Sequence, residues 1–310
     1  MIKQKKIIFL FIVIVSFISL LFSIKLIDIF LQKKFGLGTP VIYETSRTVG
    51  YTIKSDQNIK RRGNNIIINN MGMRSLQNWT DNYENKIIFF GDSVTYGGSI
   101  LSNDELFSEK VCDELNKKDN NFLCGNLGVN GYSLFSIIRS IKYKNFTNEN
   151  LIIVKIIANN FPRIFHNSIS QPFWTKEIKN FFPALTEILF IYLDKFRNKT
   201  KYNLGSEKVF KDIDVKYYND LVNELNYVLM KTEKPFIILY SPSLSELENN
   251  ENNEFFKNLL KKNLKNFHDL TEIKFETKQD LYHDHIHLNK LGHEIYSKYI
   301  IDLITKGYLN

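Results

Sequence analysis

The sequence predicts an α/β fold, in which helices cover both faces of a parallel sheet, preceded by a membrane anchor. Uninterrupted apolar runs, typical of strands buried on both faces, alternate along the chain with stretches of helical periodicity. Repeated β-α units of this kind form parallel sheets with a helical layer on each side. An N-terminal apolar run predicts the anchor. At 310 residues the chain can hold one good-sized core besides the anchor and a small annex.

The anchor is expected over residues 1–34. Lys3, Lys5 and Lys6 precede an apolar run from Ile7 to Ile24, which is about long enough to cross a bilayer. A cleaved secretory signal usually has a shorter apolar stretch and a cleavage site of small residues, so an uncleaved anchor is favoured. The flanking charges favour a cytoplasmic N-terminus. We therefore expect a single-pass protein of the cytoplasmic membrane, with its folded part on the extracytoplasmic side.

A linker and a small β-rich segment are expected over residues 35–83, before a main domain at residues 84–310. Gly and Pro interrupt the linker at residues 35–40. Further along, Ile66–Ile68 is a candidate strand and Asn69–Gly72 a candidate turn.

The main domain is expected to alternate strands and helices. Asp104 is a candidate N-cap of the first helix. Apolar stripes at four-residue spacing are expected to face the sheet, with Phe107, Val111 and Leu115 in the first helix and Leu291, Ile295, Tyr299 and Leu303 in the last. The buried strands are expected at Ile87–Phe90, Phe122–Leu127, Leu151–Ile157 and Phe236–Tyr240.

An aromatic insertion at about residues 161–210 interrupts this alternation. It contains Phe181, Phe182 and the apolar run Leu189–Leu193. An extra helical layer on the sheet is favoured, because apolar helical stripes usually face a core. A cap over an active site or a surface that contacts the membrane is the alternative.

Charge and cysteine content limit the possible partners. The net charge is +8, but the lysines are scattered and no nucleic-acid-binding motif is present, which argues against a nucleic-acid partner. Cys112 and Cys124 form no CxxC pair, so a zinc ribbon is excluded. They are either two buried thiols or the disulfide of an exported domain. The absence of a Gly-x-Gly-x-x-Gly sequence argues against a dinucleotide cofactor.

Three residues predict a hydrolytic triad. Ser93 follows the first strand of the main domain, and chemistry in open α/β sheets gathers at the carboxyl ends of strands. Near the C-terminus, Asp284 and His287 are three residues apart, so the carboxylate can reach Nδ1 of the imidazole on a single turn. That contact fixes the tautomer and leaves Nε2 free to take a proton from a serine hydroxyl, which is otherwise a weak nucleophile.

The same C-terminal segment has two other interpretations. His283, His285 and His287 alternate, so on an extended strand they would face one way and could ligate zinc. The sequence contains no further evident cluster of ligands, which argues against a metal. A polar surface loop with helix-capping residues is the other alternative.

Two further loops are expected at the same sheet edge as Ser93. Asn126–Ser133 follows the second strand, and Ala158–Phe161 follows the third. A glycine N–H and an asparagine amide are suitable hydrogen-bond donors for an oxyanion. Suitable residues in four loops at one edge are much less expected by chance than in one loop.

In these four blocks the chain resembles the SGNH or GDSL hydrolases, whose hallmark is four short blocks holding Ser, Gly, Asn and His. Gly91–Ser93, Asn126–Gly131, Asn159 and Asp284–His287 are similar to the four blocks in order and spacing. The resemblance covers roughly residues 84–160 and 280–305. Residues 68–75 are similar to a lead-in of envelope-associated members.

The resemblance implies a three-layer, flavodoxin-like α/β/α fold and assigns the site residues. It implies Ser93 as nucleophile, His287 as base and Asp284 as its partner. It also implies an oxyanion hole formed by the Ser93 N–H, the Gly131 N–H and the Asn159 side chain. The third block departs from the family pattern Gly-x-Asn-Asp, because it has Ile157 in place of Gly and Asn160 in place of Asp. Asn160 therefore lacks the charge that normally helps to hold this loop.

The resulting hypothesis is a membrane-anchored serine esterase that forms an acyl-enzyme on Ser93, with an envelope glycan or lipid ester as substrate. No metal or organic cofactor is implied. Transfer of the acyl group to a glycan hydroxyl is an alternative, which would make the protein an O-acyltransferase of envelope polysaccharide. A catalytically weak binding module that retains the fold is another.

Overall fold

The computed structural model of the chain describes residues 2–117, 121–143, 148–163, 165, 178–202, 215–248, 253–273 and 279–307. The chain divides into two compact units. One, called here the helical unit, comprises Met1–Pro40, Ile59–Gly63 and Glu177–Leu204. The other, called the sheet unit, comprises Val41–Asn58, Asn64–Lys176 and Gly205–Asn310.

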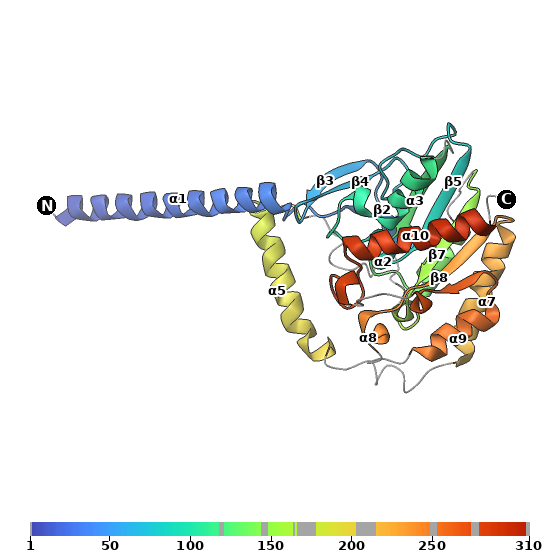
Figure 1. Cartoon of the computed structure of the whole chain (residues 1–310). Coiled ribbons are helices and arrows are strands. Elements are labelled where there is room, and N and C mark those ends of the chain that lie inside the picture. Colours follow the sequence, from blue (N-terminus) through green and yellow to red (C-terminus); the bar gives the residue numbers. More distant parts are fainter. Residues whose placement is uncertain are drawn as a thin grey trace. The chain divides into compact units, whose positions relative to one another are not determined.

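The core of the sheet unit is a five-stranded parallel sheet with the strand order β6-β5-β7-β8-β9 (Figure 1). All four strands expected in the main domain are confirmed, and their residues are buried nearly throughout because helices cover both faces. The short edge strand has only three half-buried residues and no apolar run, so the sequence pattern does not reveal it. The strands are β5 (Asn85–Gly91), β6 (Phe122–Gly128), β7 (Leu151–Ile156), β8 (Phe236–Tyr240) and β9 (Phe267–Asp269).

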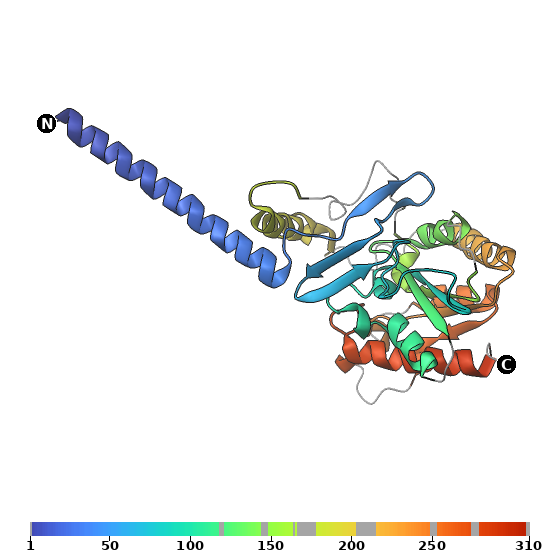
Figure 2. The same ribbon diagram turned by 90° about the horizontal axis from the view of Figure 1, so that it is seen from above.

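Helices cover the two faces of this sheet, which confirms the expected three-layer α/β/α fold (Figures 1 and 2). Helix α10 packs beside α3 on one face, and α4, α7 and α9 pack side by side on the other. The α-helices of the sheet unit are α2 (Ser93–Tyr96), α3 (Phe107–Asn116), α4 (Leu134–Tyr143), α7 (Val215–Lys231), α8 (Leu244–Leu247), α9 (Glu254–Asn263) and α10 (Lys290–Gly307). Short 3-10 helices lie at η1 (Asn103–Glu105), η2 (Ala158–Asn160), η4 (Leu270–Glu272) and η5 (Gln279–Leu281).

Two small β-ribbons precede the main sheet. Strands β1 (Tyr43–Ser46) and β2 (Gly50–Ile53) form an antiparallel pair, and β3 (Gln57–Arg61) pairs with β4 (Asn64–Ile68). The candidate strand at Ile66–Ile68 lies within β4. The candidate turn after it is also confirmed, because the N–H of Gly72 donates to the carbonyl of Asn69 at 3.1 Å.

The start of the first long helix differs from the expectation. Asp104 does not cap α3 but lies within η1, whose preceding residue Ser102 forms a capping box with Glu105. Helix α3 begins only after Leu106. The expected stripe of Phe107, Val111 and Leu115 is nevertheless fully buried.

The last helix, α10, buries a different stripe from the expected one. Its expected first residue, Leu291, is 45% exposed, whereas the other three members of that stripe are partly buried and pack against the hydrophobic core at the edge of the most buried face. The physical reason lies at Gly292, where a Cβ atom would come within 2.3 Å of the carbonyl oxygen of Leu281. This close approach turns the neighbouring face of α10 toward the sheet. That face carries the buried residues His293, Tyr296, Ile300 and Ile304.

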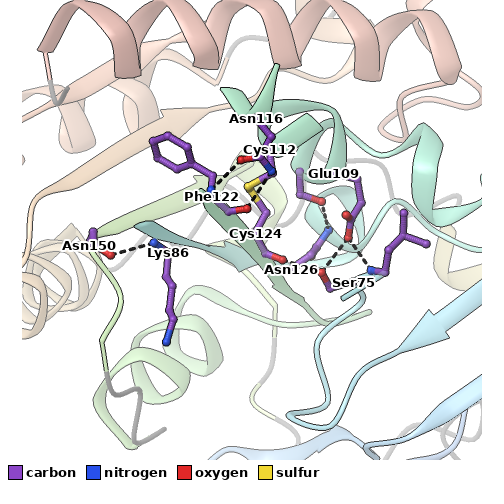
Figure 3. Close-up of a disulfide and its surroundings, with 11 residues drawn as sticks. Ser75, Lys86, Glu109, Cys112, Asn116, Phe122, Cys124, Asn126 and Asn150 are labelled. Atoms are coloured by element: carbon purple, nitrogen blue, oxygen red, sulfur yellow. Dashed lines mark hydrogen bonds between the residues drawn. A yellow bond between two sulfur atoms is a disulfide. The ribbon is translucent and has the colours of Figure 1, made fainter. Parts of the chain in front are cut away.

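A disulfide joins α3 to strand β6 (Figure 3). Its two members, Cys112 and Cys124, have Cα atoms 5.8 Å apart, a separation that suits a disulfide. Of the two states expected for these cysteines, the structure therefore has the bridged one. Neighbouring contacts fasten the same elements: in Figure 3, the Ser75 hydroxyl lies 2.8 Å from the carboxylate of Glu109 in α3 and 2.6 Å from the carbonyl oxygen of Cys124, and its proton bridges these two acceptors.

The helical unit consists mainly of α1 (Ile2–Phe35) and α5 (Pro183–Tyr202). Helix α1 is a candidate membrane span by length and composition, with a mean hydropathy of 3.1 in its most apolar window. Helix α5 is the longest described element of the aromatic insertion; residues 164, 166–177 and 203–214 lie outside the described residues. Helix α5 belongs to the same compact unit as α1 and contacts it.

Candidate active site

The expected site residues lie at the carboxyl edge of the sheet, where its strand order reverses. From β5 the chain crosses first to β6 on one side and then to β7 on the other. The carboxyl ends of β5 and β7 are therefore neighbours at the switch point, where ligands of open α/β sheets usually bind. Ser93 follows β5 and Asn159 follows β7, so the topology brings their loops together.

Ser93 is presented by a tight turn between β5 and the single-turn helix α2. The extended Asp92 caps that helix by accepting a hydrogen bond from the Val94 N–H at 3.0 Å. At Gly91, a Cβ atom would lie 2.0 Å from the Thr95 hydroxyl and 2.8 Å from the carbonyl oxygen of Lys155. Only glycine fits there, so the Gly-Asp-Ser sequence has a steric reason beside its chemical one.

His287 and Asp284 meet Ser93 from the far end of the sequence. His287 Nε2 lies 2.9 Å from Ser93 Oγ, and its Nδ1 lies 2.8 Å from Asp284 Oδ2. The segment is held as a turn, because the backbone N–H groups of Ile286 and His287 both donate to Asp284 Oδ1. The structure thus brings the three expected triad residues into direct contact.

The electrostatics of Asp284 settle the direction of these hydrogen bonds. Partial burial alone would raise the pKa of this carboxyl group. Hydrogen bonds from the His287 ring and from the N–H groups of His287 and Ile286 outweigh burial and hold the pKa well below its ordinary value. An ionised carboxylate only accepts hydrogen bonds, so Nδ1 of His287 carries the proton. In the neutral imidazole, Nε2 is then the acceptor that faces the Ser93 hydroxyl.

The end of β6, which leads into the second loop, is fastened to the serine turn. The buried side chain of Asn126 donates to the carbonyl of Thr95 at 2.8 Å and accepts from the Gly128 N–H at 2.9 Å. Further along, Gly131 has a φ of 80°, a left-handed conformation that favours glycine. Since β6 pairs with β5, this loop flanks Ser93 on one side.

The third loop, after β7, flanks Ser93 on the other side and forms η2. Asn159 is exposed there, whereas Asn160 is fully buried. Asn160 Oδ1 accepts from the Ile157 N–H at 2.7 Å, while Nδ2 donates to Asp92 at 3.1 Å and to the carbonyl of Tyr132 at 3.0 Å. An aspartate could not make the two donations, so the asparagine at this position is well matched to its surroundings.

Arg163 is a residue of this site that the sequence analysis missed. Its guanidinium forms an ion pair with Asp92 and donates to the carbonyl of Tyr132 at 3.1 Å. Arg163 and Asn160 therefore both bind the same two acceptors, one beside Ser93 and one beside Gly131. Together they fasten the first and second loops to the third. The available signal was a lone arginine four residues after Asn159.

Arg74, from the lead-in at residues 68–75, holds the other side of the serine turn. Its buried guanidinium donates to the carbonyls of Tyr96 (at 2.6 Å), Gly98 and Leu101. These carbonyls lie in the segment that follows Ser93. The lead-in thus contributes to the site by fixing the backbone beyond α2.

The described residues contain no group of three or more His, Cys, Asp or Glu side chains that could hold a metal ion. Of the three alternating histidines, His287 contacts Ser93 and Asp284, whereas His285 has a largely exposed side chain. The zinc interpretation has no structural support among these residues.

Several solved structures are similar to this chain. One is a member of the lipolytic protein G-D-S-L family from Veillonella parvula, with 14% sequence identity and a TM-score of 0.44; 71% of this chain and 98% of that chain are covered. Another is the lipase/acylhydrolase from Enterococcus faecalis, with 13% identity, a TM-score of 0.45 and coverage of 72% and 96%. A third is the psychrotrophic esterase EstA from Pseudoalteromonas sp., with 11% identity, a TM-score of 0.45 and coverage of 73% and 100%.

No family model and no curated protein matches the sequence. The similarity to solved structures therefore concerns the fold alone, and G-D-S-L family members are among the proteins in which it is found.

Proposed function

We propose that this protein is a serine ester hydrolase. The observation that carries the proposal is the hydrogen-bonded chain from Ser93 Oγ through the His287 ring to Asp284, with heavy-atom distances of 2.9 and 2.8 Å. A nucleophile, a base and a group that orients the base are thus within reach of one another, which is the arrangement that nucleophilic catalysis by serine needs.

In the proposed reaction, His287 Nε2 takes the Ser93 proton as Oγ bonds to the carbonyl carbon of an ester. The imidazolium, stabilised by the ionised Asp284, then gives that proton to the leaving alcohol as its C–O bond breaks. Water attacks the resulting acyl-enzyme with His287 again as base, which releases the acid and restores Ser93. Attack by a glycan hydroxyl instead of water would turn the same acyl-enzyme into an O-acyltransferase intermediate.

The proposed oxyanion hole consists of the Ser93 N–H, the Gly131 N–H and the Asn159 side-chain amide. Its support is the position of these groups in three loops that flank one another at the sheet edge. Donors that are already held in place stabilise the negative charge of the tetrahedral intermediate without reorganising, so the fastening by Asn160 and Arg163 serves this purpose.

We place the catalytic domain outside the cytoplasmic membrane, with α1 as an uncleaved anchor. The disulfide between Cys112 and Cys124 supports an oxidising compartment, since such bonds are rare in the cytosol. An ester of a cell-envelope glycan or lipid is then the substrate class that we propose. The domain boundaries expected from the sequence, 35–83 and 84–310, also remain proposals.

The test uses the full chain in mild detergent and a fluorophosphonate probe, which labels activated serines covalently. We expect labelling of the wild type, and loss of labelling in Ser93→Ala and His287→Ala. Ser99→Ala, which changes another serine shortly after the turn, is the matched control and should label normally. Labelling that survives Ser93→Ala, or an unlabelled wild type that is folded, would contradict the proposal.

A further inference from the structure

Helix α5 carries a broad apolar surface that the described residues leave exposed. Leu189 is 53% exposed and Tyr192 66%, and Ile188, Phe190 and Leu193 are exposed beside them. These side chains follow one another within two turns of the helix. Exposed apolar patches of this kind mark surfaces that contact another apolar phase or a partner.

The opposite face of α5 is fastened to the helical unit by buried polar contacts. Glu187 accepts from the Gly38 N–H at 2.6 Å and forms a two-pronged ion pair with Arg61 in β3. At the start of α5, the fully buried Asp28 of α1 accepts from the Leu185 N–H at 3.0 Å. Charge-assisted bonds of this kind are strong and directional, so they fix which face of α5 points outward.

These contacts place the start of α5 at a defined height along α1. The apolar run of α1 ends at Ile24, and Asp28 lies four residues further, about 6 Å along the axis of α1. At the boundary itself, the Lys25 ammonium donates to the carbonyl of Phe181 and lies 4.6 Å from the centre of its ring. The polar layer on each side of a bilayer is about 5–8 Å thick. With α1 inserted, α5 therefore begins within that layer.

The direction of α5 relative to α1 determines how α5 would lie at a membrane. In Figures 1 and 2, α5 starts beside the C-terminal end of α1 and runs steeply across the axis of α1 rather than along it. A helix that begins at the height of the lipid headgroups and crosses the axis of a membrane span lies along the membrane surface. Exposed Leu, Ile, Phe and Tyr side chains are the ones that interfacial helices bury at the boundary of headgroups and acyl chains.

We propose that α5 is an interfacial membrane helix, whose exposed apolar surface is embedded in the lipid headgroup region beside the anchor. The proposal rests on α1 being an uncleaved anchor and is independent of the esterase activity. It also explains the contacts made by the residues after Ile24. Lys25 and Asp28 hold α5 at its height, so α1 is a structural part of the unit and not only a tether.

The test reads the depth of single sites in the full chain, reconstituted into phosphatidylcholine vesicles. The described residues contain no free cysteine, so an introduced one can be labelled without reduction with a small fluorophore. Leu189→Cys carries the probe on α5, and Val15→Cys carries it in the middle of α1. Tyr227→Cys, at an exposed aromatic residue of α7 in the sheet unit, is the matched control.

We expect lipids with a nitroxide at a shallow acyl position to quench the Leu189 probe at least threefold more than the Tyr227 probe, and aqueous iodide to show the reverse order. Deep nitroxides should quench the Val15 probe, which shows that the anchor is inserted. An inserted Val15 probe with a Leu189 probe that iodide quenches as strongly as the control would overturn the proposal. Protection of Leu189 from both quenchers would overturn it too, since protein would then cover the helix. Fluorophosphonate labelling of Ser93 in the same vesicles reports the proposed activity separately.

Discussion

A buried lysine beneath the site gives a prediction whose size follows from the structure. Lys155, on β7, is fully buried, and its ammonium has no hydrogen-bond partner among the described residues. It lies between the rings of Phe107 and Tyr296, 4.7 Å from the centre of each. Burial lowers the pKa of Lys155 from 10.5 to about 7, against the opposing attraction of Asp92. Replacing it by Met keeps the chain length and removes the charge.

Burial and attraction to the aromatic rings act on the charged form of Lys155 in opposite directions, and their free energies can be compared. The difference between 10.5 and about 7 corresponds to about 5 kcal/mol by which burial, net of the attraction of Asp92, disfavours the charged form. Attraction to two aromatic rings offsets about 1 kcal/mol each. Burial therefore wins, and we expect Lys155→Met to raise the free energy of unfolding at pH 7 by about 3 kcal/mol.

The pH dependence has a definite sign. Above the folded-state pKa of Lys155 and below its ordinary value of 10.5, the unfolded chain keeps the lysine proton while the folded protein releases it. The unfolded state then binds more protons, so the stability of the wild type rises with pH, by at most about 1.4 kcal/mol per pH unit. Buried tyrosines such as Tyr296, whose pKa burial raises to about 12, add an opposite dependence only near pH 10. We expect Lys155→Met to remove this increase in stability with pH below pH 9.

The assay is urea unfolding of the full chain in mild detergent, followed by intrinsic fluorescence at pH 7, 8 and 9. Lys86→Met is the matched control, because Lys86 is equally buried but its ammonium lies 3.0 Å from Asp81. That variant should keep the pH dependence of the wild type. If Lys155→Met is less stable than the wild type and the wild type shows no rise with pH, the rings hold the lysine charged and the reasoning is refuted.

Two further predictions concern the proposed reaction, each measured on the full chain with an aryl acetate. Asp284→Asn should lower kcat about 10⁴-fold, equivalent to about 5 kcal/mol, because an amide favours the wrong tautomer of His287; a loss below tenfold would contradict the assigned role. Arg163→Met should lower kcat by about 10- to 100-fold with little change in KM, because Asp92 loses its ion pair and the three loops loosen. Arg163→Lys should recover part of the loss, whereas an equal loss in both variants would contradict a role for the charge.

The sequence predicted the parts of the fold whose residues are uniform along an element. Strands β5 to β8 are buried on both faces and therefore read as apolar runs, while β9 has the mixed sequence Phe267-His268-Asp269 and escapes this test. The buried face of α10 could not be predicted from the sequence for another reason. Leu291 fits an apolar stripe as well as Tyr296 does, and the choice depends on the contact of Gly292 with a distant carbonyl. Periodicity alone contains no information about such a contact.

The proposed site likewise has features that could be predicted from the sequence and features that could not. The contacts among Ser93, Asp284 and His287 could be predicted because the proposed chemistry restricts residue type and local spacing. The substitution of Asn160 for the expected aspartate looked like a lost charge when the third block was considered alone. In the structure the acidic partner is Asp92, in the first block, and Arg163 supplies the positive charge that faces it. With Asp92 already paired there, an aspartate at 160 would bring a second carboxylate against the first and lose both donations. Asn160, in the altered third block, and Arg163, three residues further along the chain, therefore act together on the single carboxylate of Asp92.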